Sequence, residues 1–173
     1  MTIILEIPPP KSPIPRRAPN ILLPEYRYVP KLHPHPLKNQ NGHSFGKEGQ
    51  HRYLSKNQRW DIGVDLFNNH YFWEAHEIWE GLWREAFGQE RDFLQAMIFY
   101  SASLLQEHMG RRTNAEKSIQ RAQQLITNSI KWSQKYNINL VDFQRSILTR
   151  KPEDNIPKLN TEQNALLNLS FHS

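Results

Sequence analysis

Proline is distributed very unevenly along this chain of 173 residues. Ten of the twelve prolines lie between Pro8 and Pro36. Proline lacks the backbone N–H that helices and sheets require, so residues 1–50 must be extended, turned or disordered. From Ser55 onward proline and glycine are scarce, and apolar residues recur at helical spacing. The sequence therefore predicts a non-helical N-terminal part followed by a helical body.

Four main helices are expected in the body, and a few shorter ones after them. The expected ranges are 56–68, 71–87, 90–109 and 113–136, followed by short helices over 140–148 and 161–169. Gly88 and Gly110 suit the left-handed residue that ends a helix, and Thr113 with Glu116 matches a capping box at a helix start. Short links place consecutive helices antiparallel. We therefore predict an all-α fold: an antiparallel up-down helical bundle of four to five helices with an extended Pro-rich N-terminal arm.

The length suits one domain with a sizeable core and is too short for two. Within it we expect four segments, which are a flexible N-terminal tail over 1–23, an extended Pro/His-containing arm over 24–54, the helical domain over 55–150, and a C-terminal extension with a short helix over 151–173. The chain contains no cysteine, which excludes disulfides, thiolate zinc sites, iron–sulfur clusters and a cysteine nucleophile. No secretory signal and no apolar run of about 20 residues is found, so we expect a cytoplasmic protein without a membrane span.

The net charge of +5 comes entirely from the N-terminal third. Residues 1–55 hold eight Lys/Arg against three Glu, whereas residues 56–173 hold fourteen basic and fourteen acidic side chains. A modest basic segment attracts any polyanion weakly, and most such segments are solvated surface. Nucleic acid is therefore not the expected partner. A small molecule or a protein is expected instead, and a homo-oligomer stays open.

One stretch could carry chemistry, and it reads Phe72-Trp-Glu-Ala-His-Glu-Ile-Trp-Glu-Gly-Leu-Trp83. A helix turns about 100° per residue, so His76 and Glu80 lie nearly over one another. The same geometry points Glu74 and Glu77 elsewhere, toward solvent. The aromatic residues of the stretch are predicted to line a pocket beside the pair: Phe72, Trp73, Trp79 and Trp83.

The His76 and Glu80 pair has two interpretations. In the first, Glu80 accepts a hydrogen bond from His76, and the pair is a buried polar couple in a non-catalytic adaptor or structural protein. In the second, both are ligands of a divalent transition metal (zinc, manganese or iron) or form an acid/base pair. Known motifs help by exclusion, because the string His-Glu-x-x-Glu lacks the second histidine of the zincin motif. No Walker loop, dinucleotide fingerprint or nucleophile elbow is present.

The stretch also resembles the family catalogued as domain of unknown function 309. That family's signature, His-x-x-x-Glu-x-x-Trp/Tyr, follows a Phe-Asn-x-Gly element, and the chain departs from it at His70, where the family usually has glycine. Residues 26–46, with their Pro-His-Pro and Gly-His-Ser elements, are similar to a leader in some members, and Lys31 stands where glycine is expected. The position of His70 is expected to be a turn between helices.

The resemblance implies that the arm over 24–54 is fixed on the bundle, with Tyr26, Tyr28 and Phe45 as anchors. It also offers His35 and His43 as further metal ligands beside His76 and Glu80. Around this set we place three supporting residues: Glu77, Tyr100 and Ser101. Metal binding has been proposed for the motif of this family, and a metal-dependent hydrolase is the function that this ligand set would suit best.

Overall fold

The computed structural model describes residues 4, 6–127, 129, 131–149 and 156–159. Within these residues six α-helices follow one another: α1 Lys56–Asn68, α2 Phe72–Glu85, α3 Gly88–His108, α4 Arg112–Ile126, α5 Lys131–Lys135 and α6 Leu140–Thr149. No strand is found in the described ranges, which confirms the all-α prediction. None of the described helices combines the length and the apolar character that crossing a membrane requires.

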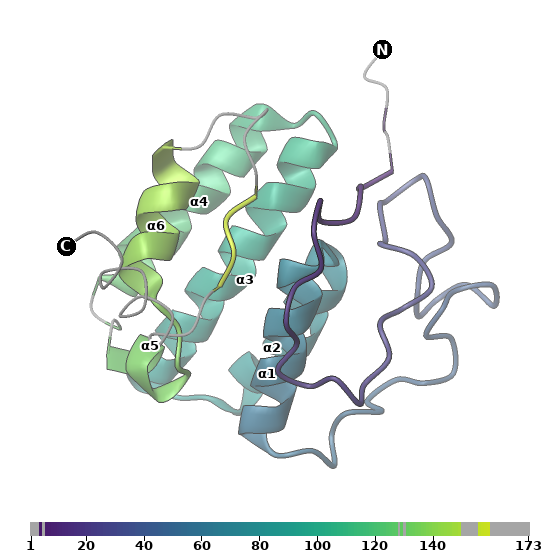
Figure 1. Ribbon diagram of the computed structural model, residues 1–173, viewed down its shortest axis with the longest axis horizontal. Helices are drawn as coiled ribbons and strands as arrows, with labels where there is room; N and C mark the ends of the chain where they lie inside the picture. The colour runs from purple at the N-terminus through teal and green to yellow at the C-terminus, as the bar shows by residue number, and fades with distance from the viewer. Residues whose placement is uncertain (1–3, 5, 128, 130, 150–155, 160–173) are drawn as a thin grey trace.

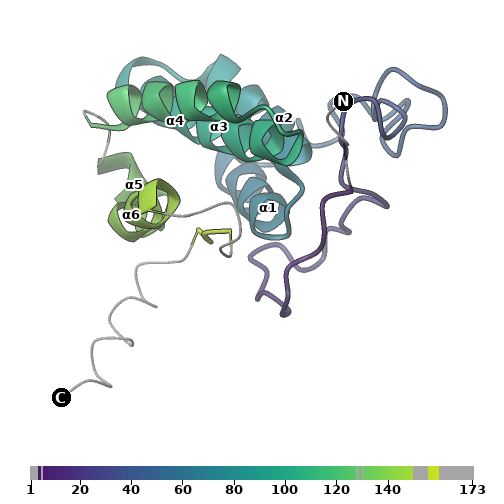
Figure 2. The same ribbon diagram turned by 90° about the horizontal axis from the view of Figure 1, so that it is seen from above.

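The helices form two layers. Figure 2 shows α2, α3 and α4 side by side in one layer, with α1 and the α5–α6 pair beneath them. α1 packs on α2, α2 on α3 and α3 on α4, and the short links make these neighbours antiparallel, as the sequence predicted. The N-terminal segment (residues 6–54, purple to blue in Figure 1) runs along the outer side of α1 and α2.

The first helix occupies the predicted range. Ser55 caps it through a capping box, since its hydroxyl accepts the Gln58 N–H and the Gln58 side chain accepts the Ser55 N–H. α3 ends at His108, and Gly110 follows with a φ of +72°, as predicted. α2 ends at Glu85, earlier than expected, and Gly88 with a φ of +54° begins α3.

The helix predicted over 113–136 is two helices. α4 begins at Arg112 and has no side-chain cap, so the predicted capping box at Thr113 is wrong. It ends at Ile126, and just beyond that end the Ser129 hydroxyl donates to the carbonyls of Leu125 and Ile126. The short helix predicted over 161–169 lies outside the described residues.

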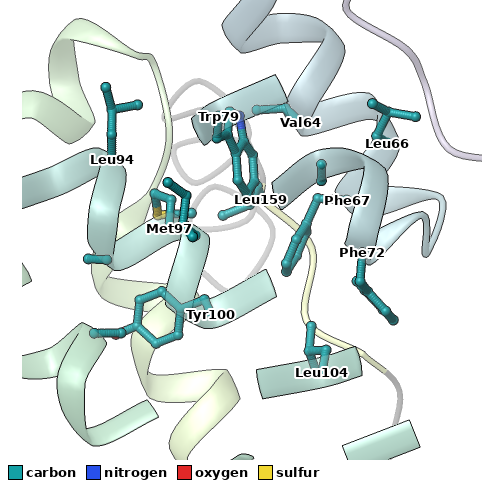
Figure 3. Close-up of a cluster of buried hydrophobic side chains, with 14 of the residues drawn as sticks. Val64, Leu66, Phe67, Phe72, Trp79, Leu94, Met97, Tyr100, Leu104 and Leu159 are labelled. Atoms are coloured by element: carbon teal, nitrogen blue, oxygen red, sulfur yellow. The ribbon is translucent and has the colours of Figure 1, made fainter. Parts of the chain in front are cut away.

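The core lies between the two layers and is rich in aromatic rings (Figure 3). The indole of Trp79 on α2 is fully buried and stacks on Trp60 of α1 with 5.2 Å between ring centroids. Gly63 of α1 faces this indole, and a β-carbon at position 63 would lie 2.1 Å from Trp79 Nε1. The close approach of α1 and α2 therefore depends on glycine at this position.

The N-terminal segment is tied to α1 through one buried carboxylate. Asp65 is 2% exposed, and its two oxygens accept the backbone N–H groups of Arg17 at 2.8 Å and Ala18 at 2.9 Å. The Arg16 guanidinium pairs with the same carboxylate at 3.3 Å. The Arg17 guanidinium reaches further and donates to the carbonyl of Tyr136. These contacts hold residues 16–18 against the bundle.

The arm contacts α2 and the link before it. Val29 is fully buried and Tyr28 is 7% exposed, whereas Phe45 is 50% exposed and does not serve as the anchor that the resemblance implied. Lys31 and His70, the two positions where glycine was expected, have φ values of +72° and +68°. This left-handed region favours glycine, so the departures occur where the backbone geometry calls for that residue. The predicted division into four segments stays a prediction.

Candidate metal centre

The helix α2 presents two different faces. One face is buried in the core and carries Phe72, Ala75, Trp79 and Leu82. His76, Glu77 and Glu80 lie beside that face and are partly buried. One nitrogen of His76 and one oxygen of each carboxylate all lie within 4.8 Å of one another. We call these three residues the His76–Glu77–Glu80 group. It combines three potential metal ligands on little more than one helical turn.

The group has an unusual charge balance. Burial lowers the pKa of His76 below the ordinary value of 6.5, and the neighbouring charge of Glu80 counteracts this only in part. Burial raises the pKa of Glu77 above 4.5, and the charge of Glu80 raises it further. The imidazole is thus kept in the neutral form that binds metals, while two carboxylates crowd each other. A cation placed between the three side chains would relieve this repulsion.

Two basic side chains, Arg84 and Lys38, already place positive charge near the carboxylates of Glu77 and Glu80. The guanidinium of Arg84 pairs with Glu80 at 3.0 Å, and its own side chain is 63% exposed. Arg84 and Lys38 both lower the pKa of Glu77 and so oppose its repulsion from Glu80. An exposed ion pair of this kind contributes at most about 1 kcal/mol. A metal ion could therefore displace Arg84 at little cost.

The geometry of the group can be compared with that of a bound ion. Zinc holds nitrogen and oxygen ligands at about 2.0–2.2 Å, so two of its ligands in a tetrahedral site lie roughly 3.3 Å apart. The three donor atoms of the group lie within 4.8 Å of one another, and rotation about the terminal torsions of Glu77 and Glu80 would bring them to that separation. Mixed nitrogen and oxygen donors suit zinc, manganese or iron. Three ligands from one helix leave further coordination positions open.

The structure does not bring His35 or His43 into this group. The Nε2 atom of His43 lies 3.0 Å from Oε1 of Glu74. The ring of His35 packs against Tyr28 and Trp73, and its Nδ1 accepts the backbone N–H of Leu37. Two of the four predicted metal ligands, His76 and Glu80, therefore lie together.

Glu74 was predicted to face solvent, and this prediction is wrong. Its side chain is 6% exposed, because the arm covers it: the Tyr28 backbone N–H donates to Oε1 at 2.9 Å, and His43 binds the same oxygen. The angular position of Glu74 on the helix wheel faces away from the bundle core. Helical periodicity carries no information about a segment that packs on that side.

Glu77 was likewise predicted to point toward solvent, although it was also placed among the supporting residues of the site. It is partly buried and belongs to the donor group itself. The helix wheel sets Glu77 about 100° from His76, but a glutamate side chain has three rotatable bonds and can reach across that angle. The adjacency of two acids and a histidine was visible in the sequence, whereas the convergence of their tips was not.

The four aromatic residues do not line one pocket. Phe72 and Trp79 are buried in the core, Trp73 packs against Tyr28 of the arm, and the ring of Trp83 is covered by the Arg91 guanidinium at 3.9 Å. The four rings therefore lie in different parts of the molecule and do not surround a common space.

The other two supporting residues also lie in the core. The Ser101 hydroxyl donates to the Phe72 carbonyl at 2.6 Å, and the ring of Tyr100 packs edge-on against Phe143 of α6. Both side chains are fully buried. Ser101 thus joins α3 to α2, Tyr100 packs α3 on α6, and neither belongs to the donor group.

The crowding of the two carboxylates predicts a gain in stability when one is neutralised. Glu77→Gln should raise the melting temperature of the metal-free protein at pH 7 by roughly 2–4 °C, which corresponds to about 1 kcal/mol for a chain of this size. Because the folded pKa of Glu77 is raised, the wild type takes up a proton as the pH falls through that pKa, and the difference should disappear there. Thermal melts between pH 7 and pH 4 would measure this.

At a saturating zinc concentration the wild type should melt at a higher temperature than Glu77→Gln, because the ion stabilises the wild type and binds the glutamine variant more weakly. Glu116→Gln is the matched control, since Glu116 is an exposed helical glutamate paired with an arginine. A Glu77→Gln variant that melts below the wild type in metal-free buffer would contradict the assigned crowding.

Comparison with known proteins gives one match. Residues 60–118 match the model of a family described as Domain of unknown function (DUF309). This range begins at Trp60 in α1 and extends into α4, so it contains the whole His76–Glu77–Glu80 group. No curated protein and no solved structure matches the chain.

Proposed function

We propose that this chain, which belongs to the DUF309 family, binds one divalent transition-metal ion through His76, Glu77 and Glu80. The observation that carries the proposal is the convergence of one imidazole nitrogen and two carboxylate oxygens within 4.8 Å. The electrostatics support it, since burial favours the neutral imidazole and the paired carboxylates favour a cation. Zinc, manganese and iron are the ions whose preferences fit this donor set.

A hydrolytic reaction is the activity that this centre suits best. An ion held by three protein ligands keeps coordination positions open and supplies Lewis-acid chemistry for hydrolysis. The residues of the chain contribute the binding and the orientation: His76 and Glu80 from successive turns of α2, and Glu77 between them. The metal-dependent hydrolase is therefore part of the proposal, and its substrate would be a small molecule or a protein.

The alternative is a non-catalytic adaptor in which His76 and Glu80 form a buried hydrogen-bonded pair. It has less support, because Glu80 pairs with Arg84 instead and its side chain is 30% exposed. Among the described residues no hydrogen bond is found between His76 and Glu80. The metal site therefore accounts better for the three side chains.

Calorimetric titration of the metal-free full-length protein with zinc tests the proposal. The expected result is one ion per chain in the wild type, with binding weakened at least about 100-fold in His76→Ala. Arg84→Gln should tighten binding several-fold, because it removes the cation that competes for Glu80. His108→Ala is the control, since His108 is a helical histidine in the last turn of α3, outside the group. Equal affinities of the wild type and His76→Ala would refute the proposed site.

A further inference from the structure

A second cluster of reactive side chains lies where the arm meets α2. The Ser44 hydroxyl oxygen is 2.7 Å from Nδ1 of His43, and Nε2 of the same ring is 3.0 Å from Oε1 of Glu74. The three groups therefore form one hydrogen-bonded chain from hydroxyl to imidazole to carboxylate. None of these residues belongs to the His76–Glu77–Glu80 group.

The carboxylate end of this chain is buried and fixed. Glu74 is 6% exposed, and its Oε1 also accepts the backbone N–H of Tyr28 at 2.9 Å. Its second oxygen, Oε2, is buried and has no hydrogen-bond partner among the described residues. The side chain of His43 is 3% exposed, and the ring of Tyr26 packs edge-on against it. The imidazole therefore cannot turn away from its two partners.

The carboxylate also determines which ring nitrogen carries the proton. A buried carboxylate accepts hydrogen bonds, so His43 donates from Nε2 to Glu74. When the ring is neutral, this leaves Nδ1 unprotonated and able to accept the hydrogen of the Ser44 hydroxyl. Nucleophile, base and orienting carboxylate follow one another in the same order as in serine hydrolases, with the two ring nitrogens exchanged.

The loop that carries Ser44 is tightly built. The backbone N–H of Ser44 donates to the Pro36 carbonyl at 3.1 Å, and the N–H of His43 donates to the Tyr26 hydroxyl at 3.3 Å. A β-carbon at Gly42 would lie 2.3 Å from the His35 carbonyl oxygen, so the backbone at Gly42 packs directly against the backbone at His35. Such a loop holds a side chain in one place without help from a helix or a sheet.

The serine end of the chain is accessible. Ser44 is partly exposed. The residues that follow it, Phe45 to Gln50, are all exposed. A small substrate can therefore reach the hydroxyl oxygen, while the imidazole and the carboxylate stay covered by the arm.

We propose that Ser44 is a catalytic nucleophile for acyl transfer, with His43 as its general base and Glu74 as the positioning residue. The substrate class is a small carboxylic ester. Ser44 Oγ attacks the acyl carbon while its proton passes to His43 Nδ1. The bond to the alcohol breaks, and the alcohol leaves with that proton. Water then attacks the acyl-serine through the same base, releases the acid and restores the hydroxyl.

Covalent labelling tests this role directly. The full-length protein is incubated with a fluorophosphonate probe, in which Ser44 Oγ would displace fluoride from phosphorus and keep the phosphonyl group. Intact mass and peptide mapping should place one adduct on Ser44, and Ser44→Ala should abolish it. Ser12→Ala, at an exposed serine of the N-terminal segment, should label like the wild type. A folded wild type without an adduct on Ser44 would overturn the proposal.

The roles of His43 as the base and Glu74 as the positioning residue are tested by the rate at which Ser44 is labelled. His43→Ala should label at least about 100-fold more slowly, and added imidazole should restore part of the rate. Glu74→Gln should lower the maximal labelling rate without changing the half-saturating probe concentration. His33→Gln is the control, because His33 also pairs with a glutamate but its Nδ1 meets a backbone N–H instead of a hydroxyl. Wild-type rates in His43→Ala would contradict the assigned base.

A chelator separates this site from the proposed metal centre. Metal-free protein and zinc-loaded protein should label Ser44 at the same rate, because the step uses no ion. Labelling that disappears with the chelator would assign the reactivity to the metal centre and overturn the independent role of Ser44. The two proposals can thus fail separately.

Discussion

Gly63→Ala is expected to lower the free energy of unfolding by about 3 kcal/mol, near the upper end of what overpacking costs. The new β-carbon would lie 2.1 Å from Nε1 and 2.6 Å from Cδ1 of Trp79. The indole cannot move aside, because it is fully buried and stacked on Trp60. Only a separation of α1 from α2 would make room. Urea unfolding, followed by tryptophan fluorescence, would measure the loss.

Gly81→Ala is the matched control for this substitution. Gly81 lies inside α2, and a β-carbon there would meet no atom within 4 Å. Alanine is favoured over glycine in a helix interior by up to about 1 kcal/mol, so this variant should be slightly more stable than the wild type. The two substitutions should therefore change the free energy of unfolding in opposite directions, which distinguishes an effect of packing from an effect of helix propensity. Equal stability of Gly63→Ala and the wild type would contradict the tight contact between α1 and Trp79.

Asp65→Ala should destabilise the protein by about 3–5 kcal/mol, the range for removing one partner of a buried ion pair. The substitution leaves the N–H groups of Arg17 and Ala18 without their acceptor and Arg16 without its counter-ion. Residues 16–18 should then leave α1, and trypsin should cleave after Arg16 and Arg17 much faster. Urea unfolding and timed proteolysis would record the two effects.

Asp61→Ala provides the comparison for Asp65. Asp61 pairs with the Arg17 guanidinium at 3.3 Å, but its side chain is 36% exposed. Its loss should cost less than about 1 kcal/mol and leave the cleavage rate nearly unchanged. If both aspartate variants behaved alike, the buried carboxylate would not be the tie between the N-terminal segment and the bundle.

The helices were largely predictable because their signals are local. The range of α1 followed from apolar spacing, and the end of α3 followed from Gly110. The break between α4 and α5 was missed, since the apolar spacing of the sequence continues from Ile126 to Ile130 without a proline or glycine. Nor did periodicity reveal that residues 17 and 18 bind Asp65, which lies 47–48 positions further along the chain. Contacts of this length depend on the whole fold.

The candidate site was predictable only in part. His76 and Glu80 were found because residues four apart on a helix share one side. Glu77 was missed as a donor because a helix wheel places Cα atoms and not the tips of long side chains. His43 was assigned to the wrong neighbourhood, since it meets Glu74. Which side of α2 the arm covers depends on packing, and neither spacing nor composition encodes it.

The central claim is that His76, Glu77 and Glu80 hold one metal ion together. X-ray absorption at the zinc edge, on protein loaded with one equivalent of zinc, tests it most directly. We expect a nitrogen and oxygen shell at about 2.0–2.1 Å with the outer scattering of one imidazole, and we expect His76→Ala to lose that imidazole signal. A spectrum that is the same in the wild type and in His76→Ala would contradict the account.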